Sequence, residues 1–429
     1  MSDASQGMRV ETGGAAAQWH GEQLHLAAWA RSVKRSALQD MLSMTTRPGL
    51  LSFALGLPAA ELFPSEALGR AFADVLANDP RALQYGPPTR EMKAHVVRLM
   101  AERGVVCSEE QVFLTAGAQQ GMNLLARLLL EQGGMVVTEE LTYTGFQQVI
   151  EPYAPEVLTV PTDPRTGLDV DALESLLRGG ARPAFIYTVP EGHNPLGVSL
   201  GGEQRDRLVA LAAHYGVPLL EDDAYGFLNY DTPVEKPLRA RDERWVFYVG
   251  SFSKVLAPAL RAGWLVVPEE LVQRLTIVKE ASDIDTATFA QRAVYSYLGS
   301  GELHAHLARL RREYARRRDA MLSALGEHFP AGTRWERPAS GVFIWVELPP
   351  GLSAEELFRV GVEEEGVAFI PGRAFRVGSG PGAEGAMRLN FSNCTPELIE
   401  EGVARLGRAA HRLQRAAVSA PFVGVGEAV

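Results

Sequence analysis

Short apolar runs alternate with helical patterns over residues 66–268, and this alternation constrains the fold more than any other feature of the sequence. The runs have the length of buried strands and are bounded by turn residues. Seven of them are candidate strands: 112–114, 135–138, 157–160, 184–188, 217–221, 245–249 and 263–267. Strands that alternate with helices are typical of a parallel sheet. We therefore predict an α/β domain built on a mostly parallel seven-stranded sheet.

Changes of pattern divide the chain into four predicted parts. These are a disordered tail, an N-terminal arm, a large domain and a small α+β domain: residues 1–23, 24–65, 66–302 and 303–418. The tail is polar, rich in glycine and alanine, and aperiodic. The arm begins with a helical pattern over residues 24–44. The small domain has two predicted helices and two predicted strands: 303–329, 395–416, 342–348 and 386–391.

Charge and composition exclude several classes of protein. The net charge of −10 argues against nucleic acid as a partner. No segment approaches the length of a membrane span, and the N-terminus lacks the pattern of a secretory signal. Cys107 and Cys394 lie far apart and match no metal spacing, which indicates buried thiols in a reducing compartment. We expect a cytoplasmic protein without nucleic-acid or membrane partners.

Lys254 is one of only five lysines, and it stands among apolar residues. Burial disfavours the ammonium form, which makes a lysine a usable nucleophile or base. Ser251, Ser253 and Arg261 add the hydroxyls and the guanidinium that would bind a phosphate carrying an aldehyde. A strand end with a solvent-reaching lysine is one alternative. A Ser-x-x-Lys acyl-enzyme is another, but it also requires Lys-Thr-Gly, which this sequence lacks.

Further motifs follow predicted strands, at the edge where parallel sheets bind ligands. Residues 115–119 (Thr-Ala-Gly-Ala-Gln) lead into a helix whose N-terminus favours phosphate. Residues 222–225 (Asp-Asp-Ala-Tyr) offer carboxylates, for which a divalent metal is an alternative ligand, although no partner ligands are apparent. Tyr143 and residues 194–197 (Asn-Pro-Leu-Gly) could equally be a loop aromatic and a common turn.

The Ser-Phe-Ser-Lys run at 251–254, with Arg261 seven residues later, resembles the lysine region of fold-type I pyridoxal-phosphate (PLP) aminotransferases of class I/II. Residues 194–197 and 222–225 are similar to that family's Asn-Pro-x-Gly and Asp-x-x-Tyr. The resemblance spans residues 36–406 and looks closest to the subgroup of 2-aminoadipate and kynurenine aminotransferases. Each motif is modest, but their order and spacing together are specific.

The resemblance implies a PLP-dependent transaminase with a large and a small domain, acting as a homodimer. Lys254 would form a Schiff base with PLP and move the substrate Cα proton, first as base and then as acid. Asp222 would pair with the pyridine nitrogen, and Tyr225 would reach the phenolic oxygen. Other cofactor contacts implied by the family are Ala118, Gln119, Tyr143, Asn194, Ser251, Ser253, Arg261 and, across the dimer interface, Tyr85.

For substrates, the resemblance implies an L-amino acid donor and a 2-oxo acid acceptor, with 2-oxoglutarate expected. Arg388 would grip the α-carboxylate, next to Asn194, and Gly56 would let the arm approach the substrate. Gln39 stands where aminoadipate-preferring members have an arginine for the distal carboxylate. We therefore expect aromatic, branched or unusual amino acids rather than a strictly acidic donor.

Two positions depart from the family pattern. Ala118 replaces a common serine, which puts one hydroxyl contact to the phosphate in doubt. Residues 89–91 (Thr-Arg-Glu) replace a usual glycine, so the loop could differ or Arg90 could lie near the substrate entrance.

Two other functions are compatible with parts of this pattern. A PLP-dependent lyase would share the cofactor site. A transcriptional regulator would fuse the same fold to a winged-helix DNA-binding domain, which the roughly 25 residues before the arm are too few to form.

Overall fold

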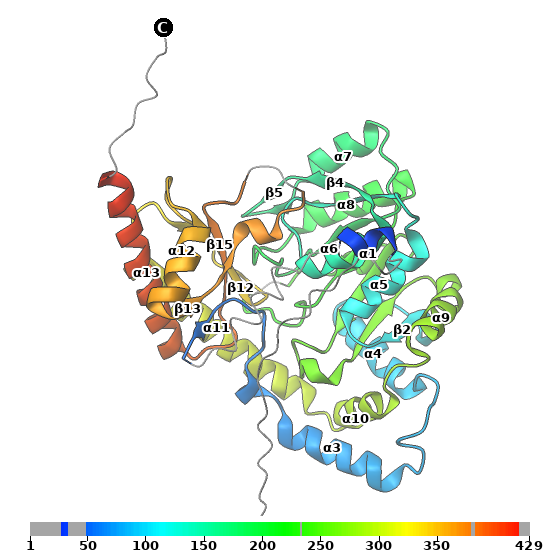
Figure 1. The fold of residues 1–429 in the computed structure, drawn as a ribbon. Coiled ribbons are helices and arrows are strands. Elements are labelled where there is room, and N and C mark those ends of the chain that lie inside the picture. The colour runs from blue at the N-terminus through cyan, green and yellow to red at the C-terminus, as the bar shows by residue number, and fades with distance from the viewer. Residues whose placement is uncertain (1–26, 33–48, 232–233, 379–381, 420–429) are drawn as a thin grey trace, which may run out of the picture.

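The computed structural model describes residues 27–32, 49–231, 234–378 and 382–419 (Figure 1). A seven-stranded sheet has the order β2-β10-β9-β8-β7-β3-β4. In that order the strands are Val112–Thr115, Gly263–Val266, Val246–Ser251, Leu219–Asp222, Ile186–Thr188, Met135–Glu139 and Glu156–Val160. β10 is antiparallel to both neighbours, and the other pairs are parallel. The predicted mostly parallel sheet is confirmed, with strand ends shifted by at most two residues.

Helices cover both faces of this sheet because successive strand side chains point to opposite sides. Val136 and Leu220 pack into an apolar layer with α5, α6 and α9, whereas Val137 and Leu219 pack with α7 and α8. These helices are Ala118–Leu129, Thr144–Ile150, Glu269–Asp283, Val170–Arg178 and Gly202–Tyr215. Burial on both faces explains why the strands read as continuous apolar runs.

A smaller antiparallel sheet has the order β11-β12-β15-β14. Its strands are Arg334–Trp335, Phe343–Glu347, Ala386–Asn390 and Ile370–Pro371. The long helices α11 and α13 pack together beside it, with α12 nearby (Figure 1). These helices are Leu303–His328, Pro396–Ser419 and Ala354–Val360. β1 (Leu51–Ser52) pairs in parallel with β13 (Val367–Ala368), so the end of the arm joins the C-terminal part of the chain.

The remaining elements connect these layers. The helices are α1 (Ala28–Ser32), α3 (Ser65–Asn78), α4 (Arg90–Glu102) and α10 (Thr288–Gly299), and β5 (Thr162–Asp163) pairs with β6 (Gly167–Leu168). Short helical turns are Ala60–Leu62, Glu109–Gln111, Glu151–Tyr153, Leu238–Ala240, Pro258–Leu260, Gly361–Glu365 and Gly372–Phe375. Within the described ranges, no helix is both long and apolar enough to cross a membrane. The predicted tail and most of the predicted arm helix lie outside those ranges.

Candidate active site

A cavity of about 450 Å³ lies between the carboxyl edge of the seven-stranded sheet and the smaller sheet. It brings together most of the residues predicted to form the site: Gly56, Ala118, Gln119, Tyr143, Asn194, Asp222, Tyr225, Ser251, Ser253, Lys254, Arg261 and Arg388. Tyr85 does not line it and is 78% exposed on the surface of this single chain. Gln39 lies outside the described residues.

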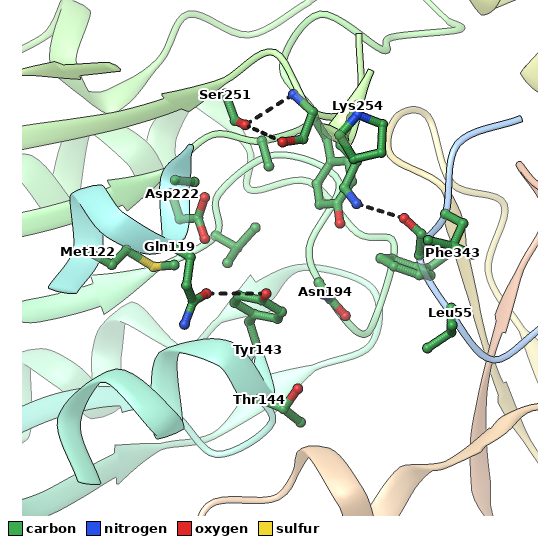
Figure 2. A pocket seen from close by; sticks show the side chains of 18 of the residues that line it. Leu55, Gln119, Met122, Tyr143, Thr144, Asn194, Asp222, Ser251, Lys254 and Phe343 are labelled. Atoms are coloured by element: carbon green, nitrogen blue, oxygen red, sulfur yellow. Dashed lines mark hydrogen bonds between the residues drawn. The ribbon is translucent and has the colours of Figure 1, made fainter. Parts of the chain in front are cut away.

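Lys254 follows β9 and extends its side chain into the cavity (Figure 2). Its Nζ donates a hydrogen bond of 2.7 Å to the carbonyl oxygen of Gly56. Burial lowers the pKa of Lys254 to about 8, and the positive charges of Arg388 and Arg261 contribute to that lowering. About a tenth of this amine is therefore neutral at pH 7, far more than for an ordinary lysine, as a nucleophile or base requires.

Gly56 meets a steric requirement beside this lysine. A Cβ at Gly56 would lie 2.7 Å from Cζ of Phe343, closer than real Cβ atoms come. A larger residue would displace either the Phe343 ring or the carbonyl that Lys254 contacts. The absence of a side chain therefore allows the arm to run beside the cavity.

Asp222 ends β8 and has one satisfied and one open carboxylate oxygen. Its Oδ2 accepts a hydrogen bond of 2.8 Å from the Tyr187 hydroxyl, while its buried Oδ1 has no hydrogen-bond partner among the described residues. Burial raises the pKa of Asp222 to about 6, and the Tyr187 hydrogen bond opposes that rise. A buried open acceptor beside a cavity fits a protonated ring nitrogen, because the new bond would compensate its burial.

One end of the cavity gathers donors suited to a phosphate. Ala118 and Gln119 begin α5, where backbone N–H groups are free and the helix dipole is positive. Ser251 Oγ donates to Ser253 Oγ over 3.0 Å and accepts from the Ser253 backbone N–H. Arg261 Nη2 donates to the carbonyl oxygen of Ala116 over 2.7 Å, which holds its guanidinium beside the helix start.

Tyr143 and Tyr225 contribute aromatic rings to the same space. The Tyr143 hydroxyl donates to Gln119 Oε1 over 3.4 Å (Figure 2), and Gln119 is itself anchored to the carbonyl oxygen of Gly145. Tyr225 meets the Phe343 ring edge-on, with 5.9 Å between centroids. Burial raises the pKa of both phenols, so both stay neutral and can donate hydrogen bonds.

Arg388, on β15, faces the cavity from the smaller sheet. Its Nη1 donates to Asn194 Oδ1 over 2.6 Å and its Nη2 to the carbonyl oxygen of Ala54 over 2.5 Å. The guanidinium carbon lies 4.1 Å from the Phe343 ring centroid and 4.6 Å from that of Phe375. Burial lowers the pKa of Arg388 to about 10. Within the described part of the chain it forms no ion pair, so this cation is available to a ligand's carboxylate.

Three further polar residues have partners outside the cavity. Glu221 accepts the backbone N–H groups of Leu238 and Arg239. Asp223 accepts from the Tyr248 hydroxyl, on the other side of the strand from Asp222. Arg90 donates to Glu109 over 2.7 Å and does not line the cavity, so its suggested place at the substrate entrance receives no support.

Sequence reasoning missed Tyr187, Phe343 and Phe375. Tyr187 stands in a strand run where an aromatic residue is ordinary core, and only the pairing of β7 with β8 places its hydroxyl beside Asp222. Phe343 begins β12 of the smaller sheet, and Phe375 ends the short helical turn Gly372–Phe375. The sequence shows an apolar residue at each position, but it carries no signal that both rings contact Arg388.

The sequence profile of the family described as aminotransferase class I and II matches residues 51–406. Aromatic-amino-acid aminotransferase 1 of Thermococcus litoralis is 36% identical over 386 residues, covering 88% of this chain and 92% of the relative. The 2-aminoadipate transaminase of Thermus thermophilus is 39% identical over 387 residues, covering 89% and 95%.

A solved structure gives the same assignment. The α-aminoadipate aminotransferase LysN of Thermus thermophilus, complexed with N-(5'-phosphopyridoxyl)-L-leucine, superposes with a TM-score of 0.84 at 37% identity, covering 91% of this chain and 98% of that one. The resemblance in the sequence motifs is thereby confirmed. The chain belongs to the class I and II aminotransferases, near the 2-aminoadipate subgroup, and is a PLP-dependent transaminase of fold type I.

Proposed function

We propose that this enzyme moves the amino group of an uncharged L-amino acid to 2-oxoglutarate, with Lys254 as the catalytic base. The observation that carries the proposal is the shared cavity of three groups. Lys254 is an amine with a lowered pKa, Asp222 has an open buried oxygen, and Arg388 is a buried cation. These are the groups that an α-amino acid and a ring with a basic nitrogen would engage.

When bound, PLP supplies an aldehyde and an electron-accepting ring. The α5 N-terminus, Ser251, Ser253 and Arg261 would hold its phosphate; Tyr143, Asn194, Asp222 and Tyr225 would hold its ring. Arg388 binds the substrate α-carboxylate and thereby turns Cα toward Lys254. Lys254 Nζ takes the proton from Cα and donates one later in the half-reaction. The neutral Tyr225 hydroxyl donates a hydrogen bond at the phenolic oxygen.

The lining of the cavity supports an uncharged donor. Among the described lining residues the charged side chains are Asp222, Lys254, Arg261 and Arg388, each with a role proposed above. The rest of the wall near Arg388 includes Leu55, Phe343, Ile370 and Phe375, which favour apolar and aromatic side chains. For the second carboxylate of 2-oxoglutarate, Thr144 and Gln148 offer neutral hydrogen-bond donors.

A homodimer is part of the proposal. Tyr85 and its neighbour Leu83 are 78% and 77% exposed, which suits residues that a second copy covers. In that assembly Tyr85 would reach the phosphate site of the other copy. Sedimentation of the wild-type protein should give a dimer. Tyr85→Phe should weaken PLP binding and leave the dimer intact. We also propose that the enzyme is located in the cytoplasm.

The test supplies single amino acids to the holoenzyme with 2-oxoglutarate and measures glutamate. We expect glutamate with aromatic or branched donors, and much slower formation with 2-aminoadipate. A lyase would instead consume the amino acid without 2-oxoglutarate and release ammonia or carbon dioxide. Such consumption, with no glutamate from any donor, would contradict the proposal.

A further inference from the structure

Two buried tyrosines bond to two adjacent carboxylates on opposite faces of β8. Tyr187 of β7 pairs in register with Leu220, two residues before Asp222. Because residues two apart on a strand share a face, the Tyr187 side chain lies on the face of Asp222 and reaches it. On the other face, Tyr248 of β9 pairs with Glu221 and reaches Asp223 by the same geometry.

The Tyr187 ring has little freedom to move. It stacks on Phe146, with centroids 3.7 Å apart and planes 3° from parallel, and it is fully buried. Its hydroxyl can donate only one hydrogen bond, and that bond goes to Asp222 Oδ2 over 2.8 Å. Oδ2 already accepts this bond whereas Oδ1 accepts none, so Oδ1 is the oxygen that most needs a partner from the cavity.

We propose that Tyr187 is a positioning residue, which turns the Asp222 carboxylate so that Oδ1 serves the cavity and which favours its ionised form. The proposal rests on the proposed role of Asp222 as the partner of the cofactor's ring nitrogen. It assigns Tyr187 a function apart from that of a core aromatic.

The charges around Asp222 indicate the direction of the effect. Burial raises the pKa of Asp222, the Tyr187 hydrogen bond lowers it, the Asp223 carboxylate raises it, and the Lys254 ammonium lowers it. The phenols of Tyr143 and Tyr225, which also face Asp222, are neutral because burial raises their pKa values. Removing the Tyr187 hydroxyl therefore raises the pKa of Asp222 and shifts it toward the protonated acid.

Tyr248 provides a matched control on the other face of the strand. It is as buried as Tyr187, and its hydroxyl donates to Asp223 Oδ2 over 2.9 Å. Asp223 does not line the cavity and forms an ion pair of 3.1 Å with Arg103. Tyr248→Phe thus removes the same kind of hydrogen bond without touching the carboxylate that faces the cavity.

The experiment compares Tyr187→Phe with Tyr248→Phe in two measurements. Infrared titration of the apoenzyme follows the carboxyl band that Asp222→Asn removes. We expect its midpoint to move to higher pH in Tyr187→Phe and to stay unchanged in Tyr248→Phe. The dissociation constant of PLP should rise about tenfold at pH 8 in Tyr187→Phe, as the loss of a hydrogen bond to a charged group implies, and by less than about twofold in Tyr248→Phe.

The two measurements separate failure of this inference from failure of the proposed function. An unmoved Asp222 midpoint in folded Tyr187→Phe would overturn the role of Tyr187, whatever the enzyme's substrates. Equal losses of PLP affinity in the two variants would overturn it as well, because a purely structural role predicts equality. If Asp222→Asn itself bound PLP as wild type does, the assignment of Asp222 would fail and this proposal with it.

Discussion

The cavity has two charged walls that are built differently. On the sheet wall, formed by Asp222 and Lys254 at the strand ends, burial raises the pKa of Asp222 and lowers that of Lys254, and the opposite charge of each group partly offsets the shift of the other. On the arginine wall, Arg388 is held by a carbonyl, an amide and two rings, with no ion pair among the described residues. The sheet wall is balanced before a ligand arrives, whereas the arginine wall lacks an anion.

This difference indicates that the reaction takes place at the sheet wall and that the substrate carboxylate is recognised at the arginine wall. An amine with a carboxylate in the same cavity can gain a proton while the opposite charge partly compensates the new one, which suits a reacting group. A buried cation without a counter-ion gains most from a ligand that brings one, which suits selection of α-carboxylates. Changes to the sheet wall should therefore lower turnover, and changes to the arginine wall should weaken the binding of amino acids.

The largest effect is expected for Lys254→Ala on the sheet wall. The variant removes the amine that moves the Cα proton, so kcat should fall about 10⁴-fold or more, the size of loss found when one member of a catalytic group of residues is removed. Lys279→Ala is the matched control, since Lys279 is also buried but pairs with Asp283 outside the cavity. A steady-state glutamate assay with both folded variants checks this. Comparable losses in both would remove Lys254 from its assigned role.

Asp222→Asn should be the next most damaging change. An amide cannot carry the charge that keeps a ring nitrogen protonated, so we expect kcat to fall about 10²–10³-fold, the size found when a preorganised electrostatic partner is lost. Asp223→Asn changes the adjacent carboxylate, which faces Arg103 and Tyr248 instead. It should lower the melting temperature and change kcat little. A larger fall in kcat for Asp223→Asn than for Asp222→Asn would contradict the distinction between the two faces of β8.

Much of the fold was predictable because its signals are local. All seven strands were located to within two residues, and the predicted helix 303–329 matches α11 to within one residue. The assembly of the site was not local. Asp222 and Arg388 lie on different sheets, and only the resemblance to a known family connected them in advance. Tyr187 was missed because its role depends on strand register, which a single sequence does not reveal.

On the arginine wall, Arg388→Gln should lower kcat/KM for amino acids about 10²-fold, mainly through KM. The expected size follows from the loss of a buried charge-assisted pair. Arg318→Gln is an informative contrast, because Arg318 is equally buried but already pairs with Asp231 and Asp319. It should destabilise the fold and leave KM nearly unchanged. If Arg388→Gln changed kcat alone, recognition would not be located on this wall.

A moderate effect is expected for the reactivity of the Lys254 amine as a function of pH, which tests the charge coupling on the sheet wall. Since the pKa of Lys254 is lowered to about 8, its neutral fraction should rise about tenfold between pH 7 and pH 9. The apoenzyme is labelled with an amine-reactive reagent, and peptide mass spectrometry measures the labelling rate of Lys254, which is proportional to its neutral fraction. Asp222→Asn should move the midpoint to lower pH, because the carboxylate that favours the ammonium is gone. An unchanged midpoint would show that the sheet wall is not charge-coupled.

The smallest effect concerns the rings beside Arg388. Phe375→Leu keeps an apolar side chain but removes one of the two aromatic faces that hold the guanidinium, a contact worth about 0.5–2 kcal/mol. KM for amino acids should rise about two- to thirtyfold, while reaction with an amine that lacks a carboxylate should change little. Phe358→Leu is the control, because Phe358 meets Phe369 edge-on at 5.6 Å and does not line the cavity. Since the loss acts only through Arg388, it should vanish when Phe375→Leu is combined with Arg388→Gln. Additive losses in that double variant would mean that Phe375 contacts the substrate itself, and that the arginine wall recognises more than the carboxylate.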